Sequence, residues 1–237
     1  MVNRRAKFVQ QQKLIVGGIA IVVIGVLVYL TTLVLTESSS DGFVEGEHYF
    51  LIDEPQRIRG DKIQVMEFFS YGCIHCYRFD DEIEAWATER QDTVSFKQTP
   101  AVANELWRNY GRAYYTMESL GILDDGHKLM FKQVHDARRN LQSAEDIAEV
   151  LAIDDVTEEA FISTFQDRVI EQKIVRADQM ARRFKVATVP SLVVHGKYHI
   201  KVTGSIGFSR MLDVADFLVQ KELAEKAGPT LTNTTEL

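Results

Sequence analysis

The two cysteines of the chain lie in one stretch, EFFSYGCIHCYRF, that directly follows a run of apolar residues. The run at residues 63–70 is continuous, as in strands that are buried on both faces of a sheet. After it, apolar side chains recur every three or four positions, which predicts one buried stripe on a helix: Cys76, Phe79, Ile83 and Trp86. The stretch therefore predicts a core strand that leads into a helix, with Cys73 at the junction.

The remaining pattern predicts a sheet whose strands are interrupted by helices. Further strands are expected at 48–52 (a short edge strand), 93–100, 190–194 and 197–202, the last two joined as a hairpin. From about residue 102 to 187 the apolar spacing predicts helices only. This order of elements predicts an α/β protein with a mixed central sheet and an all-helical domain inserted into its middle.

The predicted helices have recognisable ends. Gly121 is expected to end the first, and Ser143 with Asp146 is expected to cap the start of another. The longest is predicted to begin at Thr157 and to reach Phe184, because apolar residues recur at helical spacing throughout. A last helix from about residue 209 is expected to bury Met211, Val214 and Leu218.

An apolar segment at residues 14–35 runs for 22 residues without a charge. As a helix it would measure about 33 Å, which matches the hydrocarbon core of a bilayer. A cleaved secretory signal is the alternative, although the apolar part of such signals is shorter. We expect a transmembrane anchor with the basic residues before it in the cytoplasm. The rest of the chain would then lie in an oxidising compartment, the periplasm or the outside of a bacterium.

The charge distribution argues against a nucleic-acid partner. Without the four basic residues that precede Glu37, the chain carries 23 basic and 34 acidic residues, a net charge of −11. Nucleic-acid phosphates require a basic face.

The Cys-Ile-His-Cys pair has the spacing of a redox centre. Cys73 is expected at a helix N-terminus, where N–H groups and the helix dipole stabilise a thiolate, so its pKa should lie well below about 8.5. A protonated His75 would stabilise the anion further, and Gly72 leaves room for close approach. Cys76, one turn into the helix, is expected to be buried and less reactive. A stabilised dithiol form makes the disulfide a strong oxidant.

These properties predict disulfide transfer without a cofactor. A substrate thiolate would attack Cys73 of the Cys73–Cys76 disulfide, and a second substrate thiolate would resolve the mixed disulfide with Cys73 as the leaving group. A zinc site would need two more ligands, for which His127 and His135 are the nearest candidates by type. A purely structural disulfide would stabilise little across so short a loop.

EFFSYGCIHCY, with TVPSLVVHGKY far downstream, resembles the DsbA family of thiol:disulfide oxidoreductases over roughly residues 45–225. The resemblance implies a thioredoxin-like fold with a helical insertion. It also implies these roles: Cys73 as the nucleophile, Cys76 as its buried partner, His75 as the residue that makes the pair oxidising, and Val189 with a cis Pro190 as the substrate-binding loop. Ile74 departs from the proline that is commonest there, which leaves the strength of oxidation open.

Two charged residues also fit this family. Glu67 resembles the buried acid beneath the active site, and Lys97, expected on an adjacent strand, resembles its partner. A buried carboxylate there could relay the proton of Cys76. The alternative is that Glu67 is only a paired buried charge.

The expected partners are reduced exported proteins, the bilayer around residues 14–35 and, by resemblance, a DsbB-like quinone-linked membrane oxidase. A monomer is expected. Two alternatives remain: a reductase or isomerase of the same fold, and a membrane-tethered module that uses the thiols to bind metal or peptide.

The expected segments are a basic cytoplasmic one (1–13), the anchor (14–35), a linker (36–47), the first part of the thioredoxin-like domain (48–101), the helical insertion (102–175), the second part of the domain (176–227) and a disordered tail (228–237).

Overall fold

The computed structural model describes residues 24–26, 42–151, 153 and 155–227. The expected cytoplasmic segment at 1–13, nearly all of the expected anchor at 14–35 and the expected tail at 228–237 lie outside the described residues. Within the described ranges, no helix is both long and apolar enough to cross a bilayer. The chain divides into two units, and the second, Phe43–Leu237, contains both cysteines.

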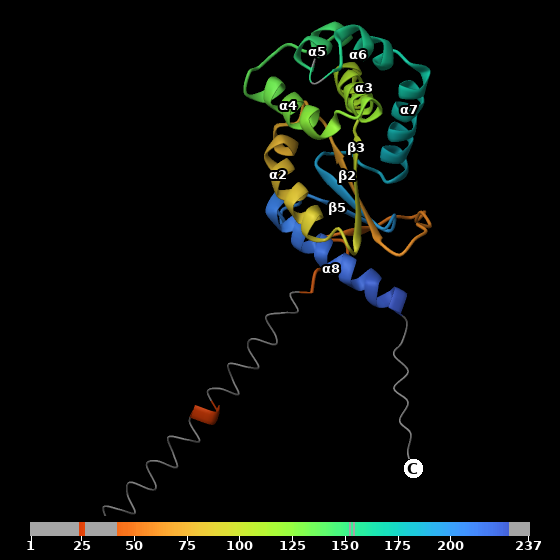
Figure 1. Ribbon diagram of the computed structural model, residues 1–237. Coiled ribbons are helices and arrows are strands. Elements are labelled where there is room, and N and C mark those ends of the chain that lie inside the picture. The colour runs from red at the N-terminus through yellow and green to blue at the C-terminus, as the bar shows by residue number, and fades with distance from the viewer. Residues whose placement is uncertain (1–23, 27–41, 152, 154, 228–237) are drawn as a thin grey trace, which may run out of the picture. The chain divides into compact units, whose positions relative to one another are not determined.

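A mixed sheet, five-stranded within the described residues, forms the centre of this unit (Figure 1). Its strands are β1 (Phe50–Leu51), β2 (Ile63–Phe69), β3 (Val94–Pro100), β4 (Ser191–Val194) and β5 (Tyr198–Lys201), in the order β1-β5-β4-β2-β3. β3 runs parallel to β2, and the other neighbours are antiparallel. The predicted mixed sheet and its short edge strand are confirmed. The strand β2, which leads to the cysteines, lies in the buried interior.

The predicted hairpin between β4 and β5 turns at His195 and Gly196, which have φ angles of 50° and 66°. Two consecutive left-handed residues form the kind of tight turn that matches the twist of the flanking strands. Glycine is also required for space, because a Cβ at Gly196 would lie 2.8 Å from the backbone oxygen of Gln56.

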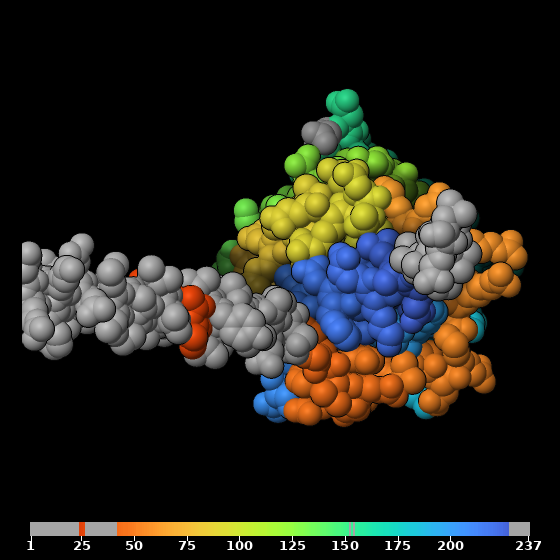
Figure 2. Space-filling model, turned by 90° about the horizontal axis from the view of Figure 1, so that it is seen from below, coloured from red at the N-terminus to blue at the C-terminus, as the bar shows by residue number. Residues whose placement is uncertain are grey.

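Two helices, α2 (Ile74–Glu89) and α8 (Phe208–Ala227), share a hydrophobic core with one face of the sheet. The predicted stripe of α2 is buried, as are Met211, Val214 and Leu218 of α8. A hydrogen bond of 2.9 Å from Trp86 Nε1 to Asp216 Oδ1 joins the two helices. Figure 2 shows α8 (blue) lying alongside α2 (yellow) at the surface.

Between β3 and β4 the described chain is helical, as predicted. The helices are α3 (Glu105–Leu120), α4 (Leu123–His135), α5 (Ala144–Val150), α6 (Glu158–Phe165) and α7 (Arg168–Arg183). Gly121 ends α3 in the left-handed conformation, and Ser143 and Asp146 form the expected capping box at α5. The predicted domain boundary between residues 175 and 176 falls inside α7, which contacts both α3 and β3.

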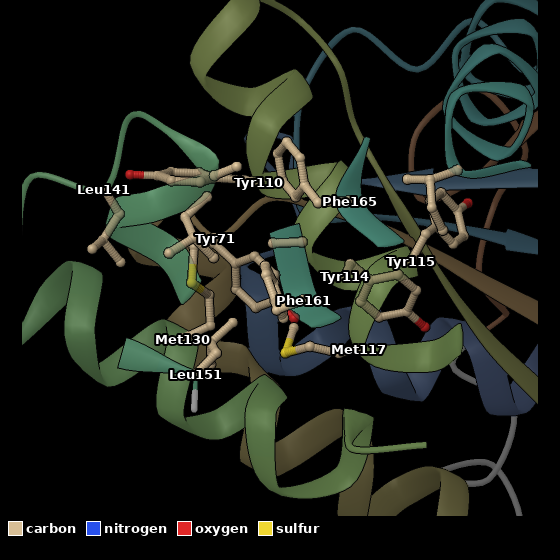
Figure 3. Close-up of a cluster of buried hydrophobic side chains, with 14 of the residues drawn as sticks. Tyr71, Tyr110, Tyr114, Tyr115, Met117, Met130, Leu141, Leu151, Phe161 and Phe165 are labelled. Carbon is tan, nitrogen blue, oxygen red and sulfur yellow. The ribbon is translucent and has the colours of Figure 1, made fainter. Parts of the chain in front are cut away.

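The inserted helices enclose a core rich in aromatic side chains (Figure 3). Tyr71, which follows β2, reaches into this core beside residues of α3, α4 and α6, so the loop before the cysteines is anchored in the insertion. Its ring packs edge-on against Phe131 of α4 at a centroid distance of 4.9 Å. The cluster thereby fixes the position of the active-site loop relative to the helices.

The prediction of one long helix from Thr157 to Phe184 is wrong. The chain leaves the helical conformation at Asp167, which has φ −63° and ψ 142°, and the Asp167 carboxylate accepts a hydrogen bond of 2.7 Å from the Val169 backbone N–H. Asp167 therefore caps a new helix, α7. Val169, one of the apolar residues whose spacing suggested the single helix, is 54% exposed.

Candidate active site

Cys73 caps the N-terminus of α2 with its sulfur. Its backbone is extended, with φ −101° and ψ 110°, and its Sγ accepts a hydrogen bond of 3.2 Å from the backbone N–H of Cys76. Both cysteines are free thiols in this structure, so the site is described in its dithiol form. The predicted junction of strand and helix thus places a sulfur where a helix N-terminus offers unpaired donors.

The surroundings of Cys73 lower its pKa to about 7, because the Cys76 side chain and the backbone N–H groups of Cys76 and His75 hydrogen-bond to the sulfur. Burial acts in the opposite direction. The predicted direction is confirmed, and the helix end supplies part of the cause. Cys73 is 8% exposed, because the cis-proline loop and the helical insertion close around it.

Cys76 is buried to 1% exposure, as predicted. Burial is the largest cause that raises the pKa of its thiol, followed by the hydrogen bond with Cys73 and the charges of Glu67 and Cys73. At neutral pH Cys76 therefore keeps its proton while Cys73 is close to half ionised. This asymmetry gives the two sulfurs different chemistry.

The side chain of His75 stacks on Phe208, at the start of α8, with a centroid distance of 4.8 Å and an interplanar angle of 21°. Its backbone N–H is among the groups that lower the pKa of Cys73. The electrostatic effect of a protonated imidazole stays a prediction.

The loop before β4 faces the cysteine pair. The peptide bond between Val189 and Pro190 is cis, as the resemblance predicted, and Cys73 Sγ lies 3.5 Å from the carbonyl oxygen of Val189. Beside this loop is a groove of about 560 Å³ whose largely apolar wall includes Val102, Trp107, Ala181, Val186 and Val189. An extended peptide that reached Cys73 could lie in this groove.

Gly72 allows a close contact with the wall of this groove. A Cβ at this position would lie 2.5 Å from Trp107 Nε1, so any larger residue would displace the indole from the loop that carries Cys73.

The expected pairing of Glu67 with Lys97 is wrong. In the parallel register Glu67 lies opposite Gln98, while Lys97 lies opposite Met66. Because successive side chains of a strand point to opposite faces, Lys97 is directed away from Glu67. Lys97 is exposed beside a surface cavity lined by Arg59.

Gln98 takes the place expected for the lysine, and its Nε2 donates a hydrogen bond of 3.0 Å to Glu67 Oε2. Glu67 is 1% exposed, and burial raises the pKa of its carboxyl to about 8. The Gln98 bond opposes that effect, whereas the charges of Asp80 and Cys73 add to it. Glu67 therefore carries a proton through much of the neutral range.

A second group of polar side chains, which we did not predict as part of the site, lies behind Glu67. Asp80 Oδ1 is 2.9 Å from His127 Nε2, and the Tyr71 hydroxyl is 2.6 Å from His127 Nδ1. The sequence suggests His127 and His135 only as candidate metal ligands, whereas His135 stacks on Tyr77. Asp80 was detectable in the sequence as an acid between Phe79 and Ile83, on the buried stripe of the helix.

Comparison with known proteins assigns the family. The sequence profile of the family named Thioredoxin matches residues 60–214. The thiol:disulfide interchange protein DsbA of Pseudomonas aeruginosa is 32% identical over 188 residues, or 79% of this chain and 89% of that protein. The protein of the same name from Azotobacter vinelandii is 34% identical over 161 residues, or 68% of this chain and 75% of that protein.

Solved structures agree with this assignment. The crystal structure of Pseudomonas aeruginosa DsbA superposes with a TM-score of 0.74 and 32% identity, covering 79% of this chain and 98% of that one. Oxidoreductase DsbA from Xylella fastidiosa gives a TM-score of 0.71 at 29% identity, covering 76% of this chain and 97% of that one. The cysteine pair at a helix start, the cis-proline loop opposite it and the inserted helices thus occur in a chain that belongs to the DsbA family of thiol:disulfide oxidoreductases, within the thioredoxin family.

Proposed function

We propose that this protein is a dithiol oxidase that donates its Cys73–Cys76 disulfide to reduced exported proteins. The observation that carries the proposal is the position of Cys73 as the cap of α2, where its Sγ accepts the Cys76 backbone N–H at 3.2 Å. These donors lower the pKa of the Cys73 thiol to about 7. A stabilised thiolate lowers the free energy of the dithiol form. Reduction of the disulfide is therefore favourable, and the disulfide is a strong oxidant.

The transfer takes two exchange steps. A substrate thiolate attacks Cys73 Sγ, the bond between Cys73 and Cys76 breaks, and Cys76 leaves with the electron pair and takes up a proton. A second substrate thiolate then attacks the substrate sulfur of the mixed disulfide, and Cys73 leaves as a thiolate. The substrate loses two electrons and gains a disulfide, while the enzyme pair becomes the dithiol. Cys73 is the better leaving group of the pair because its pKa is low.

Glu67 is proposed as the proton carrier for Cys76. Its negative charge is one cause of the raised pKa of the Cys76 thiol, so the two groups are electrostatic neighbours. A carboxyl with a pKa of about 8 can both hold and release a proton near neutral pH. Cys76 has to gain a proton when the pair is reduced and lose one when it is reoxidised.

Substrate binding is assigned to the groove and to the backbone of Val189. Main-chain hydrogen bonds give affinity for an extended peptide without a sequence preference. The apolar wall of the groove suits the exposed apolar side chains of unfolded proteins. His75 is proposed to assist the thiolate from the exposed side of the site.

We place the catalytic unit outside the cytoplasmic membrane of a bacterium, in the periplasm, held by residues 14–35. The support is the length of that uncharged segment and the basic residues that precede it. A quinone-linked membrane oxidase of the DsbB type would reoxidise the pair, and the anchor would keep the two proteins close.

The test is to mix the oxidised protein with a reduced, unfolded protein whose activity requires disulfides. Recovery of activity, with stoichiometric appearance of the Cys73–Cys76 dithiol, is expected. Equilibration with glutathione should give a potential well above the value of about −270 mV typical of a disulfide reductase. A potential near that value, with no transfer to the reduced protein, would show that the protein is a reductase instead.

A further inference from the structure

Behind the active site, one amide contacts three groups that can carry a proton. Gln98 Nε2 lies 3.0 Å from Glu67 Oε2, 3.3 Å from Asp80 Oδ1 and 3.3 Å from His127 Nε2. Glu67, Asp80 and His127 are all buried. Two buried carboxyl groups thus share one donor, and ionising both would bury two negative charges.

The hydrogen positions follow from counting donors. The distance of 2.9 Å between His127 Nε2 and Asp80 Oδ1 requires a proton between the atoms, and a carboxylate can only accept it. His127 then accepts a hydrogen bond at Nδ1 from the Tyr71 hydroxyl, at 2.6 Å. This arrangement leaves both hydrogens of the Gln98 amide for Glu67 and Asp80. A proton on His127 Nε2 satisfies the contacts with Asp80 and Tyr71, and the Gln98 amide nitrogen, 3.3 Å from Nε2, is then a second donor that does not hydrogen-bond to the ring.

The remaining surroundings of His127 are aromatic. The rings of Phe69 in β2, Tyr114 in α3 and Phe131 in α4 lie 5.2, 6.0 and 5.1 Å from its ring centroid. The groups able to ionise that face His127 are Asp80 from α2, Tyr71 from the loop after β2, Tyr114 from α3 and, through Gln98 of β3, Glu67 of β2. The neighbouring Lys128 turns outward and pairs with Glu84 at 2.6 Å.

We propose that His127 is a positioning residue for the redox reaction: by donating to Asp80 it keeps that carboxyl ionised, so that the proton shared by the two buried acids resides on Glu67, beside Cys76. The inference rests on the proposed role of Glu67 as proton carrier. Under this proposal, His127 of the helical insertion determines whether Glu67 or Asp80 exchanges protons with the cysteine pair.

Removing the His127 donor should shift the shared proton from Glu67 toward Asp80. In His127→Phe an aromatic ring still fills the cage, but Asp80 loses its hydrogen bond of 2.9 Å with His127 and keeps the one of 3.3 Å from Gln98, so it should compete with Glu67 for the shared proton. Glu67 should then ionise well below its pKa of about 8. His127→Gln offers an N–H donor to Asp80 without an imidazole, so it should retain the wild-type behaviour. Phe131→Leu disturbs the same cage but none of the hydrogen bonds, and it serves as the matched control.

The experiment uses the reduced full-length chain and follows each carboxyl carbon by NMR during a pH titration. Glu67 is expected to titrate near pH 8 in the wild type, in His127→Gln and in Phe131→Leu, and several-fold less of it should be protonated at neutral pH in His127→Phe. The rate at which oxidised glutathione closes the cysteine pair should show its Glu67-dependent inflection at correspondingly lower pH. If Glu67 titrates alike in the wild type and in His127→Phe, or if His127→Gln behaves as His127→Phe does, the proposal is wrong.

A measurement on the unaltered protein keeps the proposal testable even if His127→Phe does not fold. Nitrogen NMR should find His127 neutral and protonated at Nε2, and a proton on Nδ1 alone would overturn the proposal. None of these readouts requires a protein substrate. Loss of disulfide transfer with an unchanged titration pattern would therefore count against the proposed function and not against the role of His127.

Discussion

At the scale of single residues, the chemistry depends on the different surroundings of two sulfurs that are three positions apart in the sequence. Cys73 lies at a helix end with donors directed at it, whereas Cys76 is enclosed and faces the charge of Glu67. The first sulfur is stabilised as an anion and the second as a thiol. A substrate therefore remains bonded to Cys73 until a second thiolate displaces it.

Replacing Cys76 should trap that bonded state. In Cys76→Ala the mixed disulfide between Cys73 and a substrate cannot be reversed by the neighbouring thiol, so adducts should accumulate in cells. Non-reducing gels should show them as bands that disappear on reduction. In the matched variant Cys73→Ala, adducts and oxidase activity should both be lost. Adducts that form through Cys76 instead would contradict the assignment of the attacked sulfur.

Glu67 should make the stability of the reduced protein depend on pH. Its pKa is raised from 4.5 to about 8 in the folded state, so its stabilising contribution is complete below pH 4.5 and is lost as the pH rises through about 8. Glu67→Gln has no proton to lose. The variant should therefore be more stable than the wild type above about pH 8, by on the order of 4 kcal/mol, with the difference shrinking as the pH falls.

Urea denaturation at several pH values measures this difference. Glu105→Gln, an exposed substitution in the first turn of α3, is the control and should show no comparable gain at high pH. A Glu67→Gln curve that runs parallel to the wild-type curve at every pH would mean that Glu67 does not titrate in this range.

At the scale of elements, the spacing of apolar residues and the residues that end or cap helices predicted most of the fold. The continuous apolar run became β2, the three-to-four spacing became the buried face of α2, and Gly121 and Ser143 mark helix ends as expected. Two errors have physical causes. Strand adjacency was predicted correctly, but register was not, and a shift of one residue moves Lys97 to the other face. The helix break at Asp167 was missed because apolar spacing continues across it.

The break itself can be tested. Asp167→Ala removes the carboxylate that caps α7 and should lower the free energy of unfolding by about 1 kcal/mol, with little effect on disulfide exchange. Asp155→Ala, at an exposed position in the turn before α6, is the matched control and should be nearly neutral. Chemical denaturation of both variants measures their free energies of unfolding. Equal values for the two variants would argue against a capping role of Asp167.

At the scale of the whole molecule, the active site is assembled from segments far apart in the chain. The cysteines follow β2, the cis-proline loop precedes β4 more than a hundred residues later, and the polar group behind them includes a histidine of the insertion. The first two were predictable because sequence motifs mark them. The third was not, because which side of α4 meets α2 depends on the packing of the insertion.

The anchor prediction also belongs to this scale. The full-length chain should remain with the membrane fraction after alkaline extraction, whereas a chain beginning at residue 36 and exported by another signal should be released. Both forms should carry out disulfide exchange on a small thiol, because the catalytic unit begins near Phe43. Release of the full-length protein would show that residues 14–35 do not act as an anchor.

The most direct measurement of the central claim is an ultraviolet titration of thiolate in the reduced protein, with Cys73→Ala as the blank. One thiolate should appear with a midpoint near pH 7, while Cys76 stays protonated through the neutral range. A single midpoint near the ordinary value of 9.0 would mean that the helix end does not hold the sulfur as an anion, and it would contradict the account of this protein as an oxidase.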